Sequence, residues 1–301
     1  MRLEENNIRK HRRFLDLIKM QSSSLMAVHE VQPRLASIFS CQDRWLMAHI
    51  GLSLYFDGLA TPGADGLTTA SFVKTVVSHK IASRNTATAF LNEMLNYGII
   101  WRRPHATDRR MHVMAPAPTT LDALTFWIEV HLATLDMIDG GSRASRFHES
   151  PGAFLAHLQP AIAKGLLHDE TIMRPDQAFA HFMWMTSGFL ITERLILAVE
   201  TIAGDRDHLP VMLSSVGELT AGLNLSRAHS ARKINEAEKL GILGWIGTKG
   251  RSQMWVSRSF VLAFLDIQAA KLAVIDAAFA ELALDGSSPP LATIEQAPSV
   301  R

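Results

Sequence analysis

The chain has 301 residues, a formal net charge of +1, 48% hydrophobic residues and 20% charged residues. This composition can bury a sizeable core, which argues against disorder as the dominant state, and the length suits about two domains. A single cysteine, Cys41, excludes an intramolecular disulfide and predicts a reducing compartment, so we expect a cytoplasmic protein.

The N-terminal segment, residues 1–42, is expected to form a basic helical arm. A basic cluster at 9–13 is followed by no apolar stretch, so the segment does not resemble a signal peptide. The arm could follow DNA or form a solvated helix face, and the sequence leaves both open. The longest uncharged apolar segment, 177–192, falls short of the roughly 20 residues that a membrane span needs, which favours a buried helix and no membrane contact.

Helical periodicity dominates the rest of the chain. Apolar residues recur at helical spacing over 43–57, 120–138, 177–203 and 260–284. A loop rich in Gly, Ser and Arg is expected at 139–152, and a tail containing Ser-Ser-Pro-Pro follows Gly286. The long helices most simply pack together as a scaffold.

An internal repeat appears when the sequence is compared with itself at a shift of 143 residues. The 31 positions from 83 to 113 then contain eight identities without a gap. These identities pair Ser83-Arg84, Asn92-Glu93, Gly98-Ile99, Met111 and Val113 with Ser226-Arg227, Asn235-Glu236, Gly241-Ile242, Met254 and Val256. One residue out of phase, Leu121-Asp122 matches Leu265-Asp266. A match that also aligns the expected elements indicates a duplicated unit.

Each copy predicts the same order of elements. A short helix (68–77 or 214–221) leads through a tight turn to a serine that can cap the next helix (84–97 or 227–240). That helix stops at a glycine, and two short strands joined by a polar turn follow. Together these elements predict a winged helix-turn-helix, whose capped helix enters the major groove and whose hairpin lies along the backbone or minor groove.

The first copy resembles the MarR family of bacterial regulators. The resemblance rests on the segment 83–100 followed by 106–113, in which Asp108, Arg109 and Arg110 match the family's Asp-x-Arg wing. It covers roughly 45–138, with a weaker echo over 180–284, where the wing 247–251 contains no acidic residue. The family implies homodimers held by terminal helices, so two copies in one chain imply a covalent pseudo-dimer. Further homodimerisation through 260–284 stays open.

The expected fold is mainly α with small β-hairpin wings: two winged helix-turn-helix domains joined by a helical scaffold. We expect an arm (1–42), a first winged-helix domain (43–138), a linker or helical connector (139–176), a second winged-helix domain (177–285) and a disordered tail (286–301). Each reading segment is basic, because 74–112 and 227–258 both carry seven Lys/Arg against two Asp/Glu, a net +5. Such concentrated charge is typical of DNA-binding proteins.

These patterns predict double-stranded DNA as the partner and specific residues as its contacts. Base reading is expected from Asn85, Thr86, Thr88 and Asn92 in the first copy and from His229, Arg232 and Asn235 in the second. Phosphate and wing contacts are expected from Ser83, Arg84, Arg102, Arg103, Arg109, Arg110, Ser226, Arg227, Lys249 and Arg251. Arg232 is the best candidate for a bidentate guanine contact.

Other functions have weaker sequence support. His181, Met183 and Trp184 could belong to a pocket for a small-molecule effector, or simply fill the core. Histidine spacing predicts no metal site, and the sequence contains no nucleotide loop, nucleophile elbow or paired cysteines, so we expect neither a cofactor nor an enzyme. Two alternatives stay open: a winged helix that binds protein, and a replication-initiator-type DNA-binding protein.

Overall fold

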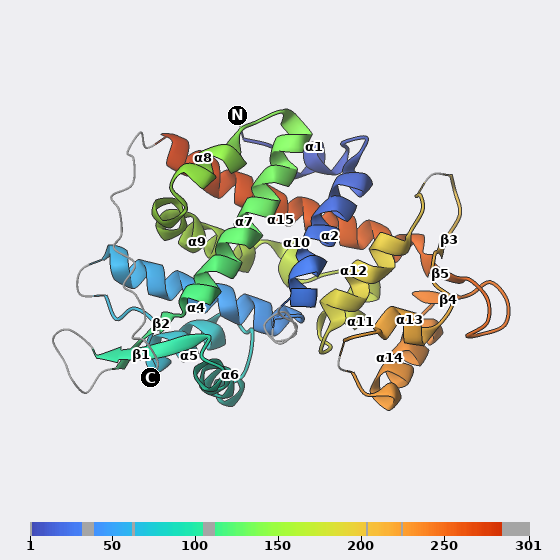
Figure 1. The fold of residues 1–301 in the computed structure, drawn as a ribbon, viewed down its shortest axis with the longest axis horizontal. Coiled ribbons are helices and arrows are strands. Elements are labelled where there is room, and N and C mark those ends of the chain that lie inside the picture. Colours follow the sequence, from blue (N-terminus) through green and yellow to red (C-terminus); the bar gives the residue numbers. More distant parts are fainter. Residues whose placement is uncertain are drawn as a thin grey trace. The chain divides into compact units, whose positions relative to one another are not determined.

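The computed structural model describes residues 2–31, 39–61, 64–104, 112–202, 204–223 and 225–284. The chain is mainly helical, with small antiparallel sheets, as the sequence predicts (Figure 1). It divides into two compact units: unit 1 comprises Met1–Ile8, Asp43–Asp169 and Lys271–Arg301, and unit 2 comprises Arg9–Gln42 and Glu170–Ala270. Within the described ranges, no helix combines the length and apolar character that crossing a membrane requires.

Unit 1 consists of helices and a two-stranded sheet. Its elements are α1 (Glu5–Arg9, through Ile8), α4 (Gln42–Ala60, from Asp43), α5 (Thr69–Ser78), α6 (Arg84–Asn96), β1 (Ile100–Pro104), β2 (His112–Pro116), α7 (Pro118–Asp139), α8 (Arg143–Glu149), α9 (Pro151–His168) and the second half of α15 (Arg258–Leu284). Strands β1 and β2 are antiparallel, with Arg102 opposite Met114. Phe56, Phe72, Ile128 and Phe147 are fully buried in this unit.

Unit 2 contains a three-stranded sheet with the order β3-β5-β4. Its elements are α2 (Phe14–Val31), α10 (Glu170–Met173), α11 (Gln177–Met183), α12 (Gly188–Ala198), β3 (His208–Val211), α13 (Val216–Thr220), α14 (Arg227–Lys239), β4 (Leu243–Trp245), β5 (Met254–Ser257) and the first half of α15. Both strand pairs are antiparallel, and Trp255 of β5 lies opposite Pro210 on one side and Gly244 on the other. Because Pro210 has no N–H, it suits an edge strand such as β3.

The expected single helix over 177–203 is wrong in extent, because the structure has two helices there. Helix α11 ends at Met183 and α12 begins at Gly188. Between them Ser187 adopts a left-handed conformation with φ 60°. A Cβ at Gly188 would lie 1.7 Å from the Phe182 carbonyl oxygen, so only glycine fits this turn. Periodicity continues across the break, which is why the sequence pattern did not show it.

The compact units follow different boundaries from those expected. Helix α9, expected in a connector, buries Leu155, Leu158 and Ile162 within unit 1. Helix α2, expected in an arm, buries Phe14 and Ile18 within unit 2. The tail 286–301 lies outside the described residues. Both helices are therefore parts of compact units.

An ion network secures the turn between α7 and α8. The Arg143 guanidinium donates to Asp139 (2.7 Å), Asp136 (3.1 Å) and Asp276 (2.7 Å), and Asp276 also accepts from the backbone N–H of Leu3 (2.6 Å). The hydrogen bond from Arg143 lowers the pKa of Asp139. Segments far apart in the sequence are thereby joined within unit 1 through one side chain.

Candidate nucleic-acid interface

The first repeated unit places a capped helix beside a β-hairpin. Thr68 caps α5 by accepting from the Ser71 backbone N–H, and the turn after α5 contains Lys80 at φ 57°. Ser83 caps α6 by accepting from the Thr86 N–H at 3.2 Å, which confirms the predicted cap. Gly98, at φ 65°, follows the helix and turns the chain into β1.

The second repeated unit has the same local order. Ser215 caps α13 by accepting from the Glu218 N–H, and Ser226 caps α14 by accepting from the His229 N–H at 3.2 Å. Gly241, at φ 69°, follows α14. Figure 1 shows that within each unit the helix pair (α5 and α6, or α13 and α14) lies next to the strands of that unit.

Backbone hydrogen bonds after the capped helix also repeat. The N–H of Ile99 donates to the Met94 carbonyl at 2.9 Å, and the N–H of Ile242 donates to the Ala237 carbonyl at 3.0 Å. The carbonyls of Ile99 and Ile242 accept in turn from the residues at which the hairpins end. These donors are the N–H groups of Ala117 (2.9 Å) and Ser257 (2.7 Å). The closure of the hairpin on its helix is therefore the same in both copies.

A third repeated contact changes the alignment of the two hairpins. The Met114 N–H donates to the Leu67 carbonyl at 2.7 Å, and the Met254 N–H donates to the Leu213 carbonyl at 2.7 Å. Met254 therefore corresponds to Met114, at a shift of 140 residues, and its sequence match to Met111 is not structural. The second hairpin is three residues shorter, so the paired Val113–Val256 and Leu121–Leu265 matches are also coincidental.

The two units differ in two further elements. Helix α5 has 10 residues and α13 has 5. Unit 2 adds strand β3, which ends two residues before Leu213 and pairs with β5 in addition to the bond from Met254 to Leu213. Trp255 fixes this sheet by stacking on His208 with ring centroids 3.7 Å apart, and a Cβ at Gly244 would lie 2.6 Å from the Trp255 ring. The sequence pattern indicated neither feature.

Helix α6 presents a polar face to solvent, with Arg84 as an exposed cation at its start. Ala87, Phe90, Leu91 and Met94 are buried, as the spacing predicts. The exposed predicted contacts are Ser83, Arg84, Asn85, Thr86 and Asn92. Thr88 is half-buried, and its hydroxyl donates to the Arg84 carbonyl at 2.9 Å, which makes it a poorer candidate for base contact. Arg44 of α4 holds the helix by pairing with Glu93 at 2.9 Å and lying over the Phe90 ring.

Helix α14 presents a basic face. Ser226, Arg232 and Asn235 are exposed, whereas His229 is half-buried with its Nε2 atom inside and without a hydrogen-bond partner among the described residues. His229 is therefore a weaker candidate for base contact than Arg232. The side chain of Arg227 lies outside what the structure describes, although its backbone begins α14.

Lysines neutralise both acidic residues of α14. Lys233 pairs with Glu236 at 2.8 Å, and this hydrogen bond lowers the pKa of Glu236. Lys249, from the β4–β5 loop, pairs with Glu238, donates to the Asn235 side-chain oxygen at 2.8 Å and lies 5.1 Å from the Trp245 ring centroid. Two residues predicted as separate DNA contacts, Asn235 and Lys249, are thus bonded to each other.

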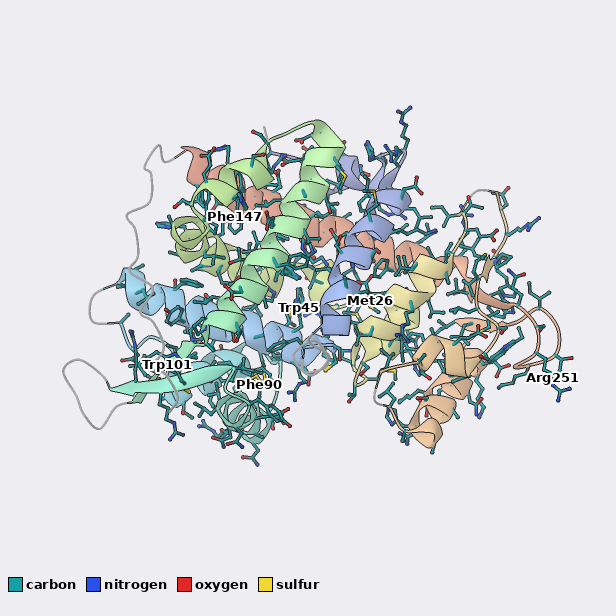
Figure 2. The ribbon with its side chains drawn as sticks, in the orientation of Figure 1. Met26, Trp45, Phe90, Trp101, Phe147 and Arg251 are labelled. Carbon is teal, nitrogen blue, oxygen red and sulfur yellow. The ribbon has the colours of Figure 1, made fainter. Side chains whose placement is uncertain are left out.

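The structure describes the loop of the second hairpin but not that of the first. Arg102 is exposed and Arg103 half-buried on β1, while Asp108, Arg109 and Arg110 lie outside the described residues. In the second loop the Thr248 carbonyl accepts from the N–H groups of Arg251 and Ser252, each at 3.0 Å. This turn exposes Arg251, which Figure 2 labels at the end of the hairpin.

The three residues expected near an effector lie in different environments. His181 Nε2 contacts the Lys233 backbone carbonyl at 3.0 Å, so it attaches α11 to α14. Met183 is 2% exposed, whereas Trp184 is 52% exposed. Their placement matches structural roles better than a shared pocket. Among the described residues, no group of three or more His, Cys, Asp or Glu side chains could hold a metal ion.

No known family model matches the chain, and neither the curated proteins nor the solved structures include one with significant similarity to it.

Proposed function

We propose that the chain is a sequence-specific, double-stranded DNA-binding transcriptional regulator with two MarR-like winged helix-turn-helix units in one polypeptide. The observation that carries the proposal is the repeated unit itself. A serine-capped helix, a left-handed glycine and a hairpin closed by the same three backbone bonds occur twice, and each coincides with a +5 segment. Capped helices of this arrangement enter the major groove with their N-terminal residues toward base edges.

Phosphate contacts would come from the residues around the helix starts and hairpins. The N-terminal end of a helix favours an anion because its amides are unpaired and its dipole is positive. Arg84 is exposed at the first position of α6, and Arg102 and Arg251 are exposed on the hairpins. These positions would fix the register of each unit on the duplex, while the exposed helix faces would read sequence.

The two reading faces have different chemistry, which predicts unlike half-sites. Helix α6 exposes the amides of Asn85 and Asn92 and the hydroxyl of Thr86, whereas α14 exposes Arg232. Asparagine suits adenine and arginine suits guanine in the major groove. A pseudo-dimer of this kind would prefer an asymmetric site whose half-site centres lie about 10 bp apart, or a multiple of that.

A second candidate function is protein binding through unit 2. The most exposed of the large apolar side chains described in this unit are Met212 (70%), Ile246 (61%) and Leu240 (56%). Exposed apolar residues that lie together can mark a protein-binding surface. The neutralised acidic residues and net positive charge of the same segment favour DNA, so we rank protein binding second.

Selection of binding sites from random duplex DNA at about 150 mM salt tests the proposal, since affinities depend on salt. We expect an enriched motif with two unlike halves. Enrichment should disappear when Arg84→Ala and Arg232→Ala are combined, because one basic residue is then lost from each reading helix. The control combines Lys164→Ala and Arg174→Ala, two exposed residues outside the repeated units, and should keep the motif. No enrichment by the wild-type protein would contradict the proposal.

A further inference from the structure

Lys249 has a fixed position between the hairpin and α14. Its ammonium group donates to Asn235 Oδ1 at 2.8 Å and pairs with the Glu238 carboxylate, and the Trp245 ring lies 5.1 Å away. An ammonium group has only donors, so the atom of Asn235 that faces it must be the oxygen. The contact therefore sets both the position and the orientation of the Asn235 amide.

This orientation determines which hydrogen-bonding groups Asn235 can offer to DNA. With its oxygen facing Lys249, the exposed amide offers its NH₂ group, which is a donor. Adenine recognition by asparagine needs both an acceptor and a donor, because adenine presents N7 and an N6 amino group. Guanine presents two acceptors, N7 and O6, in the major groove. The oriented amide therefore matches guanine better than adenine.

The neighbouring groups on α14 reinforce this preference. Arg232 lies one helical turn before Asn235, is exposed and has only donors. Glu236 and Glu238, the acceptors on the same helix, are paired with Lys233 and Lys249. The exposed side chains of Arg232, Asn235 and Lys249 thus offer donors.

The corresponding position of α6 is different. Asn92 matches Asn235 at the shift of 143 residues and is exposed, and among the described residues no lysine donates to its oxygen. Its amide can therefore offer an acceptor and a donor together, as adenine recognition requires. Within the ranges that the structure describes, only the second copy of this asparagine has its oxygen held by a lysine.

We infer that Lys249 is a specificity-determining positioning residue, which orients Asn235 so that unit 2 reads a guanine-containing half-site while unit 1 reads an A·T-containing one. This inference rests on the proposed DNA-binding function. It assigns Lys249 to base selection, where the sequence predicted a phosphate contact. Removing the ammonium group should free the Asn235 oxygen for adenine and the Glu238 carboxylate for the N4 amino group of cytosine.

Site selection with the full chain and with three variants tests the inference. For wild type we expect guanine in one half-site. Lys249→Met, which keeps an unbranched side chain beside Trp245, should reduce the preference for guanine over adenine or cytosine in that half by roughly 5- to 100-fold, with the other half unchanged. Lys249→Arg keeps the charge and the donors, so guanine should stay preferred. That result would also show that the hairpin tolerates substitution at this position.

Arg251→Met is the matched control, because it removes one charge from the same loop. It should weaken binding to all sequences about equally and reduce the slope of log affinity against log salt by about 1. A wild-type motif with no guanine in either half, or a Lys249→Met variant that behaves like Arg251→Met, would overturn the inference alone. A wild-type protein that enriches no motif would overturn the DNA-binding proposal and this inference together.

Discussion

Two histidines of unit 1 are buried and neutral in the folded chain. His49 accepts from the Gln159 amide at 3.0 Å, and His131 contacts the Trp127 carbonyl at 2.6 Å, with the ring of Trp127 against both. Burial, assisted by the charge of Lys271, lowers the pKa of His49 to about 3 and that of His131 well below its usual value. Protonation of either histidine therefore opposes folding.

The pH dependence follows from this direction. Below pH 6.5 the unfolded chain binds protons at these histidines before the folded chain does, so the free energy of unfolding falls as pH drops from 6.5 toward 3. Each histidine can contribute up to about 1.4 kcal/mol per pH unit. Urea unfolding at pH 7, 6 and 5, followed by tryptophan fluorescence, measures the slope.

His131→Leu should flatten the dependence of the free energy of unfolding on pH, because only one of these two buried histidines, His49, is left to bind a proton on unfolding. His148→Leu is the control, because its side chain is 78% exposed, and it should leave the slope as in wild type. An unchanged slope in His131→Leu would show that the acid sensitivity arises elsewhere.

Residue roles could be predicted from the sequence only where they depend on near neighbours. The Ser83 and Ser226 caps use an amide three residues later, so their position before a helix was sufficient. The bond between Lys249 and Asn235 joins residues 14 positions apart, and it exists because the hairpin folds back on α14. Because the sequence pattern does not show this fold-back, Lys249 and Asn235 were predicted as independent DNA contacts.

At the scale of elements, the serine caps define the starts of α6 and α14. Replacing Ser83 or Ser226 by alanine leaves the first-turn amides without this acceptor and should lower the free energy of unfolding by about 1 kcal/mol each. Chemical denaturation of the full chain checks this. Ser24→Ala is the control, because Ser24 is exposed within α2 and caps no amide. If Ser83→Ala and Ser226→Ala lowered the free energy of unfolding no more than Ser24→Ala does, the role given to the caps would be contradicted.

Element boundaries were predictable where periodicity and capping agreed, as for α6 and α14. Strand β3 was missed because it is short and contains Pro210, which ordinarily argues against a strand. The break between α11 and α12 depends on the close approach of Gly188 to Phe182, which apolar spacing does not reveal. The true hairpin alignment likewise required the bonds from Met114 and Met254.

At the scale of the whole molecule, charge is concentrated although the net charge is only +1. The segments 74–112 and 227–258 carry +5 each, which leaves −9 for all other residues. Such separation concentrates positive charge in the two segments, in addition to the basic cluster at 9–13. The internal repeat was visible in the sequence because the two copies share local motifs. The unit boundaries could not be predicted, because they depend on contacts between segments as distant as Arg143 and Asp276.

The central claim, that one chain reads two unlike half-sites, is tested most directly by hydroxyl-radical footprinting of a selected duplex at known stoichiometry. We predict one chain per duplex and two protected segments of different sequence, with Arg84→Ala weakening protection of one segment and Arg232→Ala that of the other. Two chains bound to identical inverted half-sites, or equal weakening of both segments by each variant, would contradict the claim.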